Sequence, residues 1–371
     1  MKLNGWRITG AVLVLAFVLC FGLISPAAAA AGDDEEREGP QLTLQEAVER
    51  AMMMDHGVRE AKLERDKARE EKHKATDRLR DSYVYMTPEY EQDHLDVIMA
   101  ELNYQRQSGR EEAAREDLEA QVVEKYVEVL AAGEKVELAR QELEAAEWEY
   151  KAAEARRRNG MLSSIGLQQA ASAVEQERSE LARAEQDLTR AYVDLNALMG
   201  QSAEARPQLV TELPFQPLEI RSMDAEVSRA VDSSHDLYAL GRYVQIQRLQ
   251  LRFYFLDLDI QEYEVELAEL QEAKAKSEVQ KQVRLFYQDI LNMEEMIVST
   301  GENVKLAEQA FHVAQVRYEV GMAARGDLIR AEADLAAARQ GLAELRYAHV
   351  SAAAAYRNLT GRTIVPAEDK V

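Results

Sequence analysis

Apolar residues recur at intervals of seven along four long stretches of the chain, and the stretches form two pairs. In the first pair these positions are Val122, Val129, Val136, Leu143 and Tyr150, then Leu167, Val174, Leu181, Leu188 and Leu195. In the second pair they are Val283, Ile290, Ile297, Val304, Phe311 and Tyr318, then Leu328, Leu335, Leu342, His349 and Tyr356. A strict repeat of seven imposes a left-handed supercoil, because a straight helix drifts by roughly 20° per heptad against it. The pattern therefore predicts long coiled-coil helices packed side by side.

Each pair of stretches is joined by a short turn that contains glycine, and the second pair is a copy of the first. Gly160 matches Gly321 at an offset of 161 residues, and Gly200 matches Gly361 at the same offset. Composition agrees, since 47% apolar residues with only 6% aromatic residues and 7 prolines are typical of long helices rather than of a sheet core. We expect an all-α, elongated fold built from two tandem copies of a coiled-coil helical hairpin.

The start of each copy carries its own helix signal. Thr43, followed three residues later by Glu46, forms a capping box that opens a helix. A related helix start at Met223–Val231 lies at an offset of 179 residues, which exceeds 161 by 18. The first copy therefore holds a small insertion. We place it at 82–107, where Pro88 must break or end a helix.

Three prolines, Pro207, Pro214 and Pro217, mark a linker between the copies. The predicted organisation is a signal peptide at 1–31, a disordered leader at 32–41, the first hairpin repeat at 42–200, the linker at 201–221, the second hairpin repeat at 222–362 and a tail at 363–371. No glycine or proline occurs from Arg242 to Thr300. A helix there either runs straight through or folds back at 250–262, and the sequence leaves both possibilities open.

The first 31 residues have the pattern of a secretory signal peptide. Lys2 and Arg7 precede an apolar core of 14 residues, Ala11–Ile24, and small residues follow it. This core is shorter than the ~20 residues that span a bilayer, so we expect export and cleavage rather than an anchor. Cys20 is the only cysteine, which excludes disulfides from the exported chain. No later uncharged run is long enough to cross a membrane as a helix.

The charge balance and the scarcity of catalytic motifs narrow the function classes. Without Lys2 and Arg7, 43 basic residues face 67 acidic ones, and the net charge of −24 disfavours nucleic acid and anionic lipid as partners. No phosphate-binding loop, nucleophile elbow or H-x-x-x-H pair occurs. We therefore expect no enzyme activity, no cofactor and no metal site. The histidines are scattered: His56, His73, His94, His235, His312 and His349.

Four sequence features occur together here. They are two hairpin copies behind a signal peptide, an N-terminal L-x-x-A-x-x-x-A stretch, the turn R-Y-E-V-G-M-A-A-R-G-D-L, and hairpins that end in L-x-G at 198–200 and 359–361. In this combination the chain resembles the TolC-like outer membrane efflux proteins. The resemblance covers residues 42–362.

The resemblance implies an assembly and a set of partners. It implies a homotrimer whose helices form a hollow conduit across the periplasm, with a membrane fusion adaptor docked at the turns and an inner-membrane pump delivering substrate. The duct would be passive and would open by untwisting of the hairpins at Gly160 and Gly321. The alternative is a periplasmic or cell-surface coiled-coil scaffold without transport activity.

The sequence departs from the family at one place in each copy. The resemblance implies membrane β-strands near 82–107 and 253–264, but both segments are short, charged and mostly helix-prone. Because unpaired strand edges are forbidden in lipid, a partial set of strands is no remedy. We therefore expect a member without the membrane strands. It would be exported to the cell envelope, to the outer membrane by family and otherwise to the periplasm or cell surface.

The candidate docking residues lie at the two turns. They are Gly160, Met161, Leu162, Gly321, Met322 and Ala323. Exposed apolar residues at a hairpin tip suit a partner hairpin, and methionine is adaptable in such contacts. The alternative is a plain helix–helix turn capped by glycine, which needs no partner.

Two further candidates lie beside the second turn, at the tunnel entrance that the resemblance implies. Asp327 would form an acidic ring in a trimer, as charged rings do in channels. We expect the helix after the turn to start at Asp327, so this residue also suits a helix N-cap or first-turn acid. Tyr318 matches a gate tyrosine of the family, although its heptad position also suits packing.

Overall fold

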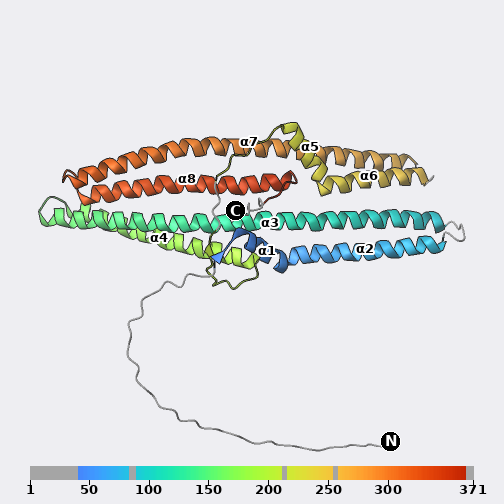
Figure 1. Cartoon of the computed structure of the whole chain (residues 1–371), viewed down its shortest axis with the longest axis horizontal. Helices are drawn as coiled ribbons and strands as arrows, with labels where there is room; N and C mark the ends of the chain where they lie inside the picture. Colours follow the sequence, from blue (N-terminus) through green and yellow to red (C-terminus); the bar gives the residue numbers. More distant parts are fainter. Residues whose placement is uncertain (1–40, 83–88, 211–214, 254–257, 365–371) are drawn as a thin grey trace, which may run out of the picture. The chain divides into compact units, whose positions relative to one another are not determined.

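The computed structural model describes residues 41–82, 89–210, 215–253 and 258–364, all within one compact unit, residues 39–371. In chain order, the elements are β1 (Gln41–Leu42), α1 (Leu44–Met54), α2 (His56–Ser82), α3 (Glu89–Arg158), α4 (Ser164–Leu198), β2 (Gln208–Leu209), α5 (Met223–Ser233), α6 (His235–Phe253), α7 (Leu258–Glu319) and α8 (Arg325–Leu359) (Figure 1). The all-α fold is confirmed. The expected signal peptide and nearly all of the leader and tail lie outside the described residues.

The two predicted hairpins are α3 with α4 and α7 with α8. α3 runs through 70 residues, about 105 Å at 1.5 Å per residue, and α7 runs through 62. The return helices α4 and α8 each have 35 residues. Each hairpin therefore has one long helix and one shorter return helix, and the two return helices are equal in length. This confirms the prediction of two tandem hairpin copies.

The helices lie side by side in a regular order (Figure 1). In the half that contains the two turns, the order is α4, α3, α8, α7, because α3 packs against both α4 and α8, and α8 packs against α7. In the other half α2 and α6 take the places of α4 and α8. α3 and α8 thus have helix neighbours on both sides, whereas α4 and α7 form the two edges.

Short elements pack around the middle of the long helices, at the point along their length where the shorter helices α2, α4, α6 and α8 end or begin. The capping box of α1 is confirmed, with the Glu46 N–H donating to the Thr43 hydroxyl and the Thr43 N–H donating to the Glu46 carboxylate. α1 ends at Met54, and Asp55 follows as its C-cap. The Asp55 carboxylate accepts the Val58 N–H at 2.7 Å at the start of α2. α1 packs on α3, and α5 packs on α7.

A two-stranded parallel sheet ties the start of the first copy to the linker. Leu42 in β1 lies opposite Leu209 in β2. The Leu42 carbonyl accepts the Val210 N–H at 3.2 Å and the Tyr126 hydroxyl at 3.1 Å. The prolines at 201–221 predicted a linker and no strand. A strand of two residues is too short to leave a hydrophobic period, so this pairing was not predicted.

The linker is also anchored to the second hairpin through a buried histidine. His349 in α8 is 1% exposed, and its Nε2 lies 3.1 Å from Glu294 Oε1 in α7. The same carboxylate oxygen accepts the Leu218 N–H at 2.7 Å, and Phe215 packs edge-on against the His349 ring. These contacts satisfy a polar residue within an otherwise apolar seam, as buried polar groups require.

The chain folds back between α6 and α7, which decides the alternative left open at 250–262. α6 packs against the start of α7, and Arg248 pairs with Glu269 at 2.7 Å across the two helices. The first copy folds back between α2 and α3, which begins directly after Pro88. Within 82–107 and 253–264, the described residues are helical, while 83–88 and 254–257 lie outside the described residues. None of the described helices has an apolar stretch long enough to cross a bilayer.

The heptad seam provides a direct test of what stabilises the second hairpin. Ile290 is fully buried, so Ile290→Ala should lower the free energy of unfolding by about 2–5 kcal/mol through lost burial and a residual cavity. Ile260 on the same helix is 58% exposed, and Ile260→Ala should change it by less than about 0.5 kcal/mol. Urea unfolding followed by far-ultraviolet circular dichroism measures both. Equal losses would contradict the seam assignment.

Candidate functional site

The two predicted turns end their first helices with the same backbone geometry. Gly160 and Gly321 have φ of +72° and +75°, a left-handed conformation that glycine adopts without strain. In each turn the N–H of the following methionine donates to the carbonyl five residues before it, at 2.8 Å in the first turn and 2.7 Å in the second. This bond, with the glycine N–H bonded to the carbonyl three residues before it, is the Schellman motif of helix C-termini.

The same motif ends the two return helices. Gly200 and Gly361 have φ of +64° and +61°. The N–H of the next residue again donates to the carbonyl five residues before it, at 2.9 Å for Gln201 and 2.8 Å for Arg362. The four glycines thus form two pairs with the offset found in the sequence. The duplication therefore extends to the hydrogen bonds that close each helix.

Both turns present methionine to solvent. Met161 is 76% exposed and Met322 is 81% exposed. Leu162 is half-buried and folds back on α4, where a Cβ added at Gly166 would lie 2.8 Å from its Cδ1. Ala323 is half-buried as well. The arrangement is a hairpin tip with one flexible apolar side chain at its end, and it can offer that side chain to another protein surface.

The helix after the second turn starts two residues earlier than predicted. Ala324 is the N-cap and α8 begins at Arg325, so Asp327 is in the first turn of the helix and not at the N-cap. Its carboxylate accepts the Ala324 N–H at 3.0 Å, which satisfies a backbone donor that the helix leaves unpaired. Asp327 is exposed, and Tyr318 is 39% exposed near the end of α7.

Side chains at the start of α8 tie the second tip to the first hairpin. The Arg325 guanidinium lies 4.6 Å from the Trp148 ring centroid, and Arg330 pairs with Glu149 at 3.0 Å. Trp148 and Glu149 precede the end of α3 by about ten residues, so the first tip extends roughly 15 Å beyond these contacts. The two tips therefore lie at the same end of the molecule in a staggered arrangement.

These cross-hairpin contacts were not predicted from the sequence. Trp148 is one of only two tryptophans in the chain, and the face of a tryptophan ring is a known partner for arginine. That signal names one side of the contact only. The partner depends on the stagger of the two hairpins, which the heptad pattern does not determine.

The described residues contain no group of three or more His, Cys, Asp or Glu side chains placed to hold a metal ion.

Three arginines, 156–158, end α3, where positive charge complements the helix dipole. At the first tip, the exposed Met161 therefore lies close to guanidinium groups.

The outer membrane efflux protein family matches residues 96–201 and 255–362, one match in each hairpin copy and together more than half of the chain. No curated protein matches the chain.

Several solved structures share the fold. The outer membrane protein VceC from Vibrio cholerae has 16% identity and a TM-score of 0.64, over 87% of this chain and 97% of that one. The outer membrane channel MtrE from Neisseria gonorrhoeae has 14% identity and a TM-score of 0.65, over 86% and 89%. The outer-membrane channel OprN has 13% identity and a TM-score of 0.66, over 87% and 91%.

The family match ends at 201 in the first copy and at 362 in the second, one residue after each of the left-handed glycines that close the return helices. Sequence match, duplicated hairpins and shared fold agree. The chain belongs to the outer membrane efflux protein family.

Proposed function

We propose that this efflux-family chain assembles as a homotrimer into a helical conduit that docks a membrane fusion adaptor at its turns and receives substrate from an inner-membrane pump. The conduit would be passive, with no chemistry of its own. The observation that carries the proposal is the pair of staggered hairpin tips, each closed by a left-handed glycine and ending in an exposed methionine.

The tips fit a docking role better than a plain turn. A turn that only reverses the chain is satisfied by glycine and its backbone hydrogen bonds. Here each tip adds further exposed apolar residues, with Ile165 67% exposed in the first hairpin and Val320 62% exposed in the second. Exposed apolar clusters of this kind characterise contact surfaces. The adaptor-docking residues would be Gly160, Met161, Leu162, Gly321, Met322 and Ala323.

One edge of the protomer carries a heptad seam that no helix of the described residues covers. Leu306 and Val313 on α7 and Val320 directly after it follow one another at intervals of seven and are 63%, 48% and 62% exposed. A seam of this period is satisfied by another helix. α4 forms the opposite edge and packs chiefly against α3. Joining the α7 edge of one copy to the α4 edge of the next would bury the seam and close a ring.

Asp327 and Tyr318 are the candidates for the tunnel entrance. In a trimer three Asp327 carboxylates would form an acidic ring that attracts cations. The same carboxylate accepts the Ala324 N–H at the start of α8. Asp327 would therefore have both a structural role in the helix and a role in the ring. Export by the segment 1–31 would bring the chain to the cell envelope, at the outer membrane or within the periplasm.

The native mass of the purified chain tests the assembly. We expect a mass three times that of the chain, and Leu306→Glu should shift it to the monomer because it places charge in the α7 seam. Gln121→Glu adds the same charge at an exposed polar position of α3, outside the α7 seam, and should leave the trimer intact. A wild-type chain that stays monomeric would exclude the conduit and favour the coiled-coil scaffold.

Adaptor binding tests the tips separately. The double variant Met161→Glu with Met322→Glu should weaken binding of a membrane fusion adaptor by at least about tenfold, because two exposed anchors become charged. Met99→Glu, at a methionine that is 44% exposed near the other end of α3, is the control. Surface plasmon resonance with immobilised adaptor measures the affinity. Equal binding by both variants would remove docking from these turns.

The contacts between the hairpins predict how easily the tips separate. Spin labels at Asn159→Cys and Glu319→Cys, in a Cys20→Ser background, report the distance between the turns by pulsed electron paramagnetic resonance. Removing Arg325 and Arg330 together (both to Ala) should broaden this distance, because a cation–π contact and an ion pair of about 0.5–1 kcal/mol each are lost. Arg317→Ala is the control. An unchanged distribution would show that these contacts do not restrain the tips.

A further inference from the structure

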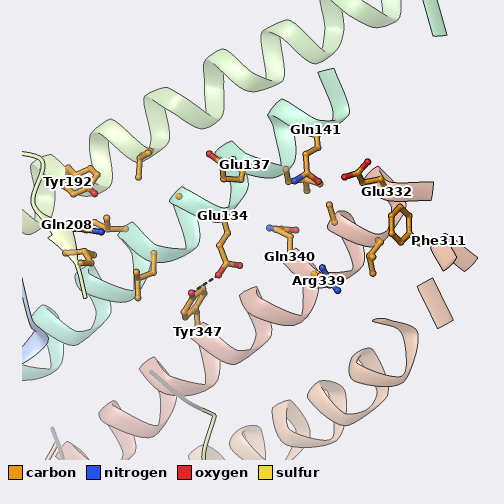
Figure 2. Close-up of a pocket in the computed structure, with 18 residues that line it drawn as sticks. Glu134, Glu137, Gln141, Tyr192, Gln208, Phe311, Glu332, Arg339, Gln340 and Tyr347 are labelled. Carbon is orange, nitrogen blue, oxygen red and sulfur yellow. Dashed lines mark hydrogen bonds between the residues drawn. The ribbon is translucent and has the colours of Figure 1, made fainter. Parts of the chain in front are cut away.

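A cavity of 620 Å³ lies between the two hairpins (Figure 2). Its walls come mainly from α3 and α8, and α4, β2 and α7 complete it. Leucines from several of these elements line it: Leu130, Leu138, Leu188, Leu209 and Leu335. Figure 2 shows Tyr192 and Gln208 at one end, Phe311 and Glu332 at the other, and Glu134 and Tyr347 between them. This volume is typical of small-molecule sites, which are mostly apolar with a few polar groups that fix orientation.

The charged groups of the cavity are unbalanced. Arg339, the one basic residue that lines it in the described part of the chain, pairs with Glu308 at 2.9 Å, and Glu137 pairs with Arg140 at 2.8 Å. Two acids remain without a cation among the described residues. Glu134 accepts a hydrogen bond from the Tyr347 hydroxyl at 2.8 Å, and Glu332 is exposed at the far end. The cavity therefore carries negative charge that the protein does not neutralise.

Tyr347 holds the Glu134 carboxylate in place. Burial raises the pKa of the Tyr347 hydroxyl, and the hydrogen bond to Glu134 raises it further. The Tyr347 hydroxyl therefore stays a neutral donor to Glu134 across the physiological pH range. A half-buried carboxylate beside leucines and aromatic rings favours a cation with an apolar body, since the rings attract positive charge as well.

The cavity stays open in the assembly proposed above. It lies between α3 and α8, which are the inner helices of the row, whereas a ring would join copies through α4 and α7. Ligand binding there needs neither a second copy nor an adaptor. Such a site is therefore a property of the single chain and does not depend on the conduit.

We propose that this cavity is a binding site for one flat, apolar organic cation, with its ring system against the leucines and Tyr347 and its positive charge at Glu134. Inorganic cations fit poorly, because the described residues form no group of three or more His, Cys, Asp or Glu side chains that could hold a metal ion. Anions are disfavoured by the uncompensated acids.

Gly133 allows the cavity to be filled without disturbing the fold. A Cβ added there meets nothing within 4 Å, and the residue lines the cavity from the middle of α3. Leucine is a better helix former than glycine by roughly 1 kcal/mol, so Gly133→Leu should not destabilise the helix. Gly301 in α7 is also unobstructed and lies outside the cavity, so Gly301→Leu is the matched control.

The test is fluorescence anisotropy of rhodamine 6G, a flat xanthene cation, with the purified full chain. We expect one site per chain, affinity reduced by at least about tenfold in Gly133→Leu, and wild-type affinity in Gly301→Leu. Glu134→Gln keeps an acceptor for Tyr347 but removes the charge, and it should weaken binding by about tenfold. Glu295→Gln, at the exposed counterpart of Glu134 in the second copy, should not.

Two outcomes would overturn the site. If Gly133→Leu binds rhodamine 6G like the wild type, the dye associates with the acidic surface at large, because this variant leaves the net charge unchanged. If fluorescein, an anionic xanthene, binds at the cavity as tightly as rhodamine 6G, the acids do not select the ligand. Neither outcome bears on native mass or adaptor binding.

Discussion

The structure depends on a narrow apolar seam along each long helix. In the second copy the exposure of successive seam residues is 0% at Val283 and Ile290, 4% at Ile297, 8% at Val304 and 39% at Tyr318. Packing is therefore tightest at the middle of the molecule and loosest at the turns. Because local stability follows the density of buried contacts, the turns belong to the part of the fold that opens most easily. The proposed docking surface thus coincides with the least constrained part of the hairpin.

The sequence predicts the elements whose signal is periodic or local. Seven-residue spacing predicts the hairpins, Gly160 and Gly321 predict the turns, and Thr43 with Glu46 predicts the start of α1. Each of these depends on neighbours within a few residues. The fold-back after α6 could not be predicted, because no glycine or proline marks it and the helices on either side have similar composition. The pairing of β1 with β2 was missed because two residues carry no period.

The same distinction between local and long-range features applies to the candidate site. The exposed methionines could be found from the sequence, since they follow the turn glycines directly. Contacts between hairpins could not: Arg330 with Glu149 and Tyr347 with Glu134 join residues from different copies. Their formation depends on the stagger between two coiled coils, and heptads allow several staggers. The cavity between the copies was invisible for the same reason, although Gly133 inside a long helix was a signal of missing side-chain volume.

α3 differs from its neighbours in having no break across 70 residues. Its partners change along its length, from α2 and α6 in one half to α4 and α8 in the other. The described helices that pack on it, α1, α2, α4, α6 and α8, each cover only part of its length. A torque applied at the first turn would therefore travel along the backbone of α3 to the opposite end of the molecule. α3 is thus one continuous mechanical connection between the two ends of the described structure, and the short elements that pack around its middle, such as α1, support it there.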